Sequence, residues 1–143
     1  MRIYVASYIG ERERAQEVQN RLRSLGHEIT VDWTAFPGVP SKERNARPGD
    51  VTDIAVRDLD GIVKAEIFIL LASVPEGRAK YAELGAAIMS AVQTGMPRIY
   101  VLGEDPVHSV FFFHPTVIRA ASLDDLLDDI GASLTIRGTE RGS

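Results

Sequence analysis

The chain has 143 residues, which suffice for one domain with a substantial core and are too few for two ordinary domains. A hydrophobic fraction of 45% and a charged fraction of 25% are typical of soluble globular proteins, and no apolar run approaches the roughly 20 residues that span a bilayer. A net charge of −4 without a basic cluster argues against a nucleic-acid polymer as partner, and the lack of cysteine removes disulfides, thiolate nucleophiles and cysteine-based metal sites.

The apolar pattern alternates between strand and helix along the chain. Short apolar runs indicate strands, and apolar residues that recur every three or four positions indicate helices. In chain order, the pattern predicts a strand at 2–6, a helix at 15–25, a strand at 28–31, a helix at 51–65, a strand at 67–72, a helix at 78–94, a strand at 98–102, a strand at 116–119 and a helix at 122–129. The first strand is a poor signal peptide, so we expect a cytoplasmic protein.

Turn and capping residues set the limits of these elements. Gly26 and Gly95 follow predicted helices as C-caps do, and Asp50 or Thr52 can cap the helix that runs to about residue 65. Residues 33–49 contain three prolines and no periodicity, which predicts a long loop. A loop of this length inside one domain is usually functional or mobile.

Alternation of strands and helices predicts an α/β fold. We expect a doubly wound, flavodoxin-like or Rossmann-like parallel sheet of about five strands with helices on both faces. Residues 1–130 are predicted to form a single domain, and residues 131–143 a flexible C-terminal tail. Ligands of such sheets bind beyond the carboxyl ends of the strands. Those ends carry residues 7–12, 72–80 and 103–114, with Trp33 at the end of the second strand.

Asp58 occupies a position where the helix at 51–65 should be apolar. It lies four residues from both Ile54 and Ile62, on the side that also carries Val51 and Leu59, whereas Asp53, Arg57, Asp60 and Lys64 form a solvated face of paired charges. Burying an unpaired carboxylate costs several kcal/mol. Asp58 is therefore either satisfied by backbone N–H groups or part of a functional cleft.

Glu83 is a second carboxylate among small residues. It lies in the first turns of the helix at 78–94, where the helix dipole favours an ionised acid by about 0.3–1 kcal/mol. Small neighbours, including Gly85, would let the helix approach the sheet and let a ligand approach Glu83. The alternative is that Glu83 is an ordinary helix charge and Gly85 has no packing role.

Together, these segments resemble the nucleoside 2-deoxyribosyltransferase family, which includes deoxynucleoside 5′-monophosphate N-glycosidases. The resemblance covers most of residues 2–102. It rests on a first strand with an early tyrosine (Ile3-Tyr4-Val5-Ala6-Ser7), the helix segment Asp58-Leu59-Asp60-Gly61-Ile62, the apolar strand after it, a loop with proline and glycine, and Tyr81-Ala82-Glu83-Leu84-Gly85-Ala86-Ala87.

The resemblance implies roles for three residues. Glu83 would attack the anomeric carbon and expel the base, Asp58 would position the sugar, and Tyr4 would hold the nucleophile. The chemistry is that of a retaining glycosidase, in which a second base or water opens the glycosyl-enzyme intermediate. The choice of acceptor separates a transferase from a hydrolase.

The resemblance and the position of the strand ends together indicate a set of substrate-binding residues. In the hydrolase branch, the loop after the first strand holds the 5′-phosphate. The predicted substrate-binding residues are Ser7, Tyr8, Ile9, Gly10, Arg12, Trp33, Glu76, Gly77 and Arg78. Glu76 is the acid of its loop that could manage base protonation. A plain N-cap role for Ser7 and a solvated charge for Arg12 are the alternatives.

A neighbouring subunit is expected to complete the pocket, as in the family. The candidate residues are His108, Ser109 and His114, which flank Val110-Phe111-Phe112-Phe113. Three consecutive aromatics cannot all face one core, so at least one should be exposed and lie at an interface. We therefore expect a homo-oligomer, a dimer or larger.

The sequence thus predicts a nucleoside 2-deoxyribosyltransferase-like enzyme that cleaves the N-glycosidic bond of a small nucleoside or nucleotide through Glu83. A nucleotide N-glycosidase with the same nucleophile is the alternative within enzymes. The same fold would also suit a non-catalytic nucleotide-binding or sensor module, or a flavodoxin-like mononucleotide binder, because fold alone does not fix function. No metal and no organic cofactor is expected.

Overall fold

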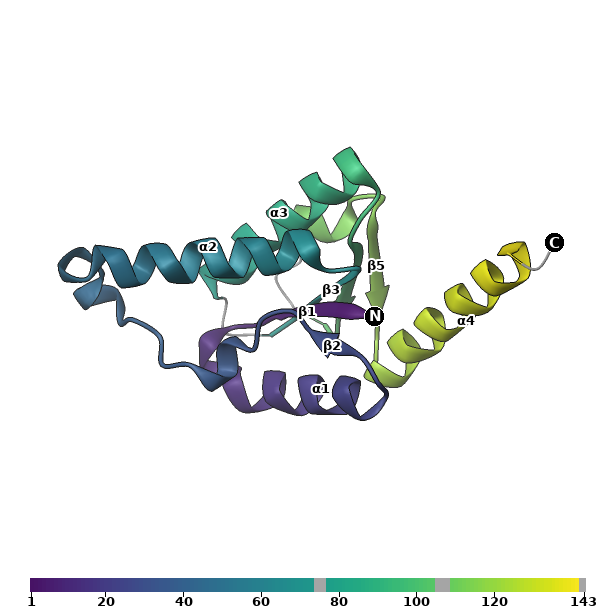
Figure 1. The fold of residues 1–143 in the computed structure, drawn as a ribbon, viewed down its shortest axis with the longest axis horizontal. Coiled ribbons are helices and arrows are strands. Elements are labelled where there is room, and N and C mark those ends of the chain that lie inside the picture. The colour runs from purple at the N-terminus through teal and green to yellow at the C-terminus, as the bar shows by residue number, and fades with distance from the viewer. Residues whose placement is uncertain (74–76, 105–108, 142–143) are drawn as a thin grey trace.

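The computed structural model describes residues 1–73, 77–104 and 109–141 (Figure 1). The strands and α-helices are β1 (Arg2–Ala6), α1 (Arg12–Ser24), β2 (Glu28–Ile29), α2 (Pro48–Lys64), β3 (Ile67–Leu71), α3 (Arg78–Thr94), β4 (Arg98–Leu102), β5 (Val117–Ala120) and α4 (Leu123–Arg141). Short 3-10 turns are η1 (Ile9–Glu11), η2 (Trp33–Ala35), η3 (Ser41–Ala46) and η4 (Val110–Phe113). Among the described residues, no helix combines the length and the apolar character that crossing a bilayer requires.

The five strands form one sheet in the order β2-β1-β3-β4-β5, and every pairing is parallel. The expected α/β fold with a doubly wound sheet is confirmed. The order in which strands are added reverses between β1 and β3. The chain first places β2 on one side of β1 and then places β3, β4 and β5 on the other side. Sheets of this kind bind ligands beyond the carboxyl ends of the two strands at such a point.

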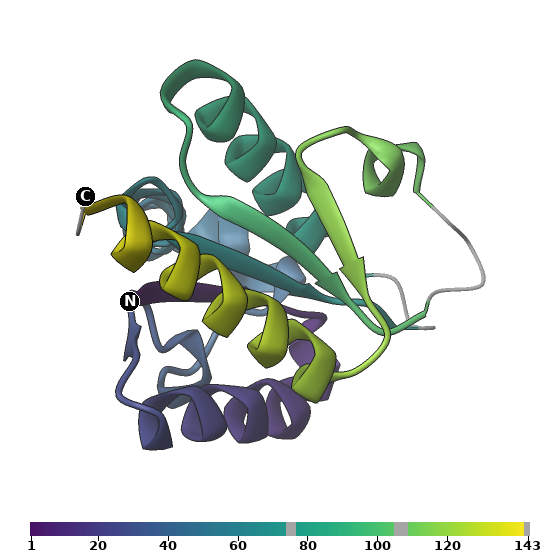
Figure 2. The same ribbon diagram turned by 90° about the vertical axis from the view of Figure 1, so that its right-hand side faces the viewer.

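Two helices cover each face of the sheet (Figures 1 and 2). α2 and α3 lie on one face and enclose one apolar cluster, whereas α1 and α4 lie on the other and enclose a second. Successive side chains of a strand point to opposite faces. In β1, Tyr4 and Ala6 therefore belong to the first cluster, and Ile3 and Val5 belong to the second.

Several element limits differ from those predicted. α2 begins at Pro48, ahead of the predicted caps Asp50 and Thr52, because proline is well suited to the first position of a helix. α4 does not end near Asp129 but continues to Arg141, so residues 131–141 are helical. The predicted loop before α2 contains η2 and η3.

The inner face of α2 packs closely on the sheet at Gly61. A Cβ atom at this position would lie 2.3 Å from Val31 Cγ2 and 3.4 Å from Tyr4 Cδ2. Ile62 is fully buried, but Leu59, which was expected to face inward, is 46% exposed. The reason is that Leu59 lies about 100° around the helix from Asp58. The absence of a side chain at Gly61 thus brings the Asp58 turn of α2 toward Tyr4.

Gly85 does not have the packing role that the sequence suggested. A Cβ atom there would meet no described atom within 4 Å. The buried residues of α3 are Lys80, Leu84, Ala87 and Ile88, and Gly85 lies to one side of them. Close approach of helix to sheet is needed at Gly61 instead.

The two glycines should respond to substitution in opposite directions. Gly61→Ala should lower the free energy of unfolding by about 1–3 kcal/mol, because the added methyl group overpacks the contact with Val31. Gly85→Ala should raise it by up to about 1 kcal/mol, since alanine favours the helix. Urea denaturation of both variants measures these changes. An unchanged free energy of unfolding in Gly61→Ala would show that the contact between α2 and Val31 can accommodate a methyl group.

Candidate active site

Three predicted catalytic residues come together from three different elements. Tyr4 lies in β1, Asp58 in the middle of α2 and Glu83 in the second turn of α3. The charges of Glu83 and Asp58 both act on the Tyr4 hydroxyl, and the charge of Asp58 acts on Glu83. The fold therefore gathers the two carboxyl groups that the sequence singled out around one buried phenol.

The Tyr4 ring is closely packed, and its hydroxyl group lies near Glu83 without a well-formed hydrogen bond among the described residues. The ring is fully buried and stacks on Phe68, with the ring centroids 5.8 Å apart and the planes 4° from parallel. Within the described residues, Tyr4 Oη has no partner in full hydrogen-bond geometry. Burial and the carboxylates of Glu83 and Asp58 raise the pKa of Tyr4, so it stays a neutral donor. A buried hydroxyl donor needs an acceptor. A small movement of the Glu83 side chain, or a bound ligand, would supply one.

Glu83 is a desolvated acid at the edge of the cluster. Burial raises the pKa of Glu83 to about 8, an interaction with the Tyr4 hydroxyl lowers it, and the negative charge of Asp58 raises it further. The side chain nevertheless retains some exposure to solvent. A carboxyl group with these properties can meet a ligand and change its protonation state near neutral pH.

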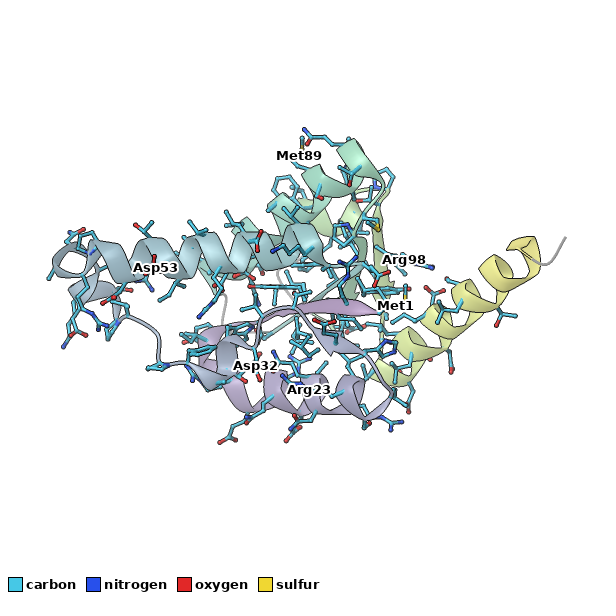
Figure 3. The ribbon with its side chains drawn as sticks, in the orientation of Figure 1. Met1, Arg23, Asp32, Asp53, Met89 and Arg98 are labelled. Carbon is cyan, nitrogen blue, oxygen red and sulfur yellow. The ribbon has the colours of Figure 1, made fainter. Side chains whose placement is uncertain are left out.

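Asp58 is paired within its own helix. Arg57 Nη2 and Nε donate to Asp58 Oδ1 at 2.9 Å and 3.1 Å. Burial raises the pKa of Asp58, and the hydrogen bond and charge of Arg57 oppose that shift. Arg57 was expected on the solvated face, where Lys64 and Asp60 form their predicted ion pair at 2.7 Å. Asp53, on the half of α2 that extends beyond the sheet, is exposed (Figure 3).

The loop after β1 is packed against the start of α3 through Tyr8. A Cβ atom at Gly10 would lie 2.3 Å from Tyr8 Cε1, and one at Gly77 would lie 3.0 Å from Tyr8 Cα and Cδ2. Ser7 Oγ donates to the Tyr8 carbonyl at 3.1 Å, and Ile9 is 55% exposed. Tyr8 thus packs between Gly10 and Gly77. It brings the loop after β1 into contact with the segment before α3, and both were predicted to bind substrate.

Arg12 and Trp33 fasten the segment after β2 to this region. Arg12 Nη1 donates to the carbonyls of Thr34 at 2.9 Å and Phe36 at 3.2 Å. Trp33 Nε1 donates to the Val5 carbonyl at 2.7 Å. The neighbouring Arg23–Asp32 ion pair ties the same segment to α1 (Figure 3). The polar groups predicted to bind substrate here therefore make internal contacts in this structure.

Two buried or half-buried cations were not singled out by sequence. Lys80 is fully buried, its Nζ donates to Ser73 Oγ at 3.0 Å, and it lies 5.2 Å from the centroid of the Tyr81 ring. Arg14 Nη1 donates to the Ala72 carbonyl at 2.7 Å, at the end of β3. The signal for Lys80 was its helical spacing, four residues before the buried Leu84.

The remaining predicted residues lie around α3 and η4. Glu76 and His108 lie outside the described residues, and Arg78 is exposed at the first position of α3. Ser109 caps η4, accepting from the Phe111 N–H group at 3.3 Å, and His114 Nδ1 pairs with Thr116 Oγ1 at 2.8 Å. Their place in another subunit's pocket stays a prediction.

Two hollows of the described surface lie away from this cluster. One is bordered by Glu66, Met96 and Arg98 at the amino end of β4, and the other separates α1 from α4 beside His27 and Asp128. Neither borders Tyr4, Asp58 or Glu83. The candidate site is thus defined by its gathered polar groups, which lie on the face of the sheet that α2 and α3 cover.

Comparison of the sequence with family models and with curated proteins gives no match. Among solved structures, the chain is similar to the CMP N-glycosidase BcmB of Clostridium botulinum, with a TM-score of 0.59 and 17% sequence identity. The fold is shared with a nucleotide N-glycosidase. The match covers 92% of this chain and 99% of that chain. At this identity it shows the fold alone, and at that level it supports the resemblance drawn from the sequence.

Proposed function

We propose that the protein cleaves the N-glycosidic bond of a nucleoside or nucleoside 5′-monophosphate. The observation that carries this proposal is the gathering of Tyr4, Asp58 and Glu83, in which a buried phenol interacts with two desolvated carboxyl groups. The fold shared with a CMP N-glycosidase supports the same class of reaction.

In the proposed reaction, Glu83 is the nucleophile. Its ionised carboxylate forms an ester bond to the anomeric carbon while the bond from that carbon to the base nitrogen breaks, and the base leaves with the electron pair and takes up a proton. Water then attacks the same carbon, releases the sugar and regenerates the carboxylate. Asp58 accepts a hydrogen bond from a sugar hydroxyl group, and the Tyr4 hydroxyl steadies the Glu83 carboxylate.

Hydrolysis is the first candidate outcome and transfer to a second base is the other. The likeness to an N-glycosidase favours water as acceptor. The resemblance of Tyr81-Ala82-Glu83-Leu84-Gly85 to the deoxyribosyltransferase motif favours a second nucleobase as the acceptor of the sugar. Both outcomes use the same intermediate, so they differ only in what reaches it first.

A product analysis separates hydrolysis, transfer and simple binding. The protein is incubated with purine and pyrimidine nucleosides and their 5′-monophosphates, with and without a second free base, and the products are separated by chromatography. Free base alone would identify a hydrolase, and a new nucleoside would identify a transferase. Neither product, in wild type and in Glu83→Gln alike, would overturn the proposal in favour of a binding module.

We further propose that the active form is an oligomer held through η4. Only Phe112 of the three aromatics is buried, whereas Val110, Phe111 and Phe113 are 75%, 56% and 66% exposed. Exposed apolar patches commonly mark interfaces. Sedimentation should show an oligomer for the wild type and a smaller species for Phe111→Asp, with reduced activity. A wild-type monomer with full activity would contradict the shared pocket.

A further inference from the structure

Arg57 and Asp58 make a contact that the helix itself does not provide. Adjacent residues on a helix point about 100° apart and do not face each other. Arg57 must therefore fold back over the helix surface for its Nε and Nη2 atoms to reach Asp58 Oδ1 at 3.1 Å and 2.9 Å. The Asp58 side chain is only 18% exposed and that of Arg57 34%, so this pair is partly shielded from solvent.

The ring of Phe36 holds Arg57 in this folded position. The guanidinium carbon lies 5.1 Å from the centroid of the Phe36 ring, in a cation–π contact. The backbone of Phe36 is fixed in turn, because its carbonyl accepts a hydrogen bond from Arg12 at 3.2 Å, while the Phe36 residue is 51% exposed. Two positions further, Gly38 lies against Ile9, whose Cδ1 would be 3.3 Å from an added Cβ. The loop before α2 is thus anchored beside the site.

Both Arg57 donors converge on one oxygen of the Asp58 carboxylate. Within the described residues, Asp58 Oδ2 accepts no hydrogen bond, and Tyr4 Oη likewise has no full partner. The charged and titratable groups that act on this cluster are Arg57 from α2, Tyr4 from β1 and Glu83 from α3. Arg57 is the cation among these groups, and it compensates one of the two acids.

We propose that Arg57 is a positioning residue of the active site, which is seated on Phe36, ties down Asp58 Oδ1 and leaves Oδ2 for a hydroxyl group of the substrate sugar. This inference rests on the proposed function for the identity of the ligand. It assigns the loop before α2 a part in the reaction, because Phe36 controls Arg57 and Arg57 controls Asp58.

The test follows the titration of Asp58 and the activity in parallel. The Asp58 carboxyl carbon is titrated by NMR in the substrate-free protein for the wild type, Arg57→Ala, Arg57→Lys and Phe36→Leu. Arg57→Ala should raise the pKa of Asp58 and lower kcat/KM about tenfold, the scale of one hydrogen bond to a charged group. Arg57→Lys should restore part of the titration shift, and Phe36→Leu should have a smaller effect in the same direction.

Arg47→Ala is the matched control, because Arg47 pairs with Asp50 at 3.0 Å at the other end of the same helix. It should change neither quantity. In an Asp58→Asn background, Arg57→Ala should cause no further loss of kcat/KM, since residues that act through one another are not additive. An unchanged Asp58 titration in Arg57→Ala, or losses that multiply in the double variant, would overturn the inference.

The two proposals fail separately. If the wild type cleaves no nucleoside or nucleotide, the proposed function is wrong, and the Asp58 titration alone decides whether Arg57 controls this carboxylate. If the wild type is active and the titration is insensitive to Arg57, the proposed function stands and the positioning role is wrong.

Discussion

Glu83→Gln should reduce base release by roughly four to six powers of ten, the scale seen when a covalent nucleophile is removed. The amide keeps the shape of the carboxyl group but cannot form the glycosyl ester. Rates from chromatography of free base under saturating substrate measure the loss. A variant that retains wild-type rates would eliminate Glu83 as the nucleophile.

The same variant should keep its fold. The pKa of Glu83 is raised from 4.5 to about 8 in the folded protein, so between these values the folded state holds a proton that the unfolded state has lost. Stability therefore falls as pH rises through this window. Glu83→Gln carries no such penalty and should unfold at or above the wild-type temperature at pH 8, so its inactivity cannot be attributed to unfolding.

The pH profile follows from the same property. The nucleophile must be ionised, and with a pKa of about 8 only about a tenth of the free protein is ionised at pH 7. The value of kcat/KM, which reports the free enzyme, should therefore rise almost tenfold per pH unit below that value and level off above it.

Asp58→Ala should lower kcat/KM about ten- to a hundredfold, since a hydrogen bond to a charged group contributes about 1.5–3 kcal/mol. A substrate that lacks the hydroxyl group bound by Asp58 should be cleaved equally by the wild type and the variant. This comparison tests the proposed partner of Asp58 directly.

Asp53→Ala and Asp60→Ala are the controls on the same helix. Asp53 is exposed, and Asp60 pairs with Lys64 in a surface ion pair whose two side chains are more than half exposed. Such residues contribute no more than about 0.5 kcal/mol to stability and should leave activity unchanged. Equal losses at all three positions would mean that the functional face of α2 is assigned wrongly.

Much of the fold could be read from the sequence because its signals are local. The buried run at residues 67–71 has the continuous apolar pattern of a central parallel strand. α3 ends at Thr94 as predicted, because Gly95 adopts a left-handed conformation with φ of 84°. The start of α2 was misplaced because a possible side-chain cap was given more weight than Pro48.

The parts of the site that sequence reasoning missed depend on contacts between distant segments. Helical spacing placed Asp58 inward correctly, but it assigned Arg57 to the solvated face. Helical spacing gives the direction in which a side chain leaves the helix. It does not give the position of the end of a long side chain such as that of arginine. The Phe36 ring that holds Arg57 comes from a loop without periodicity. The need for Gly61 likewise depends on Val31, thirty residues earlier.

Detection of a glycosyl ester on Glu83 tests the central claim most directly. A nucleoside or nucleotide with fluorine at C2′ destabilises the oxocarbenium-like transition states and should let the intermediate accumulate. Trypsin cleaves after Lys80 and Arg98, and in the resulting peptide 81–98 the only acidic side chain is Glu83. We expect mass spectrometry of the quenched reaction to find this peptide heavier by one sugar or sugar phosphate. Release of base with peptide 81–98 unmodified and the sugar on another peptide would contradict the account.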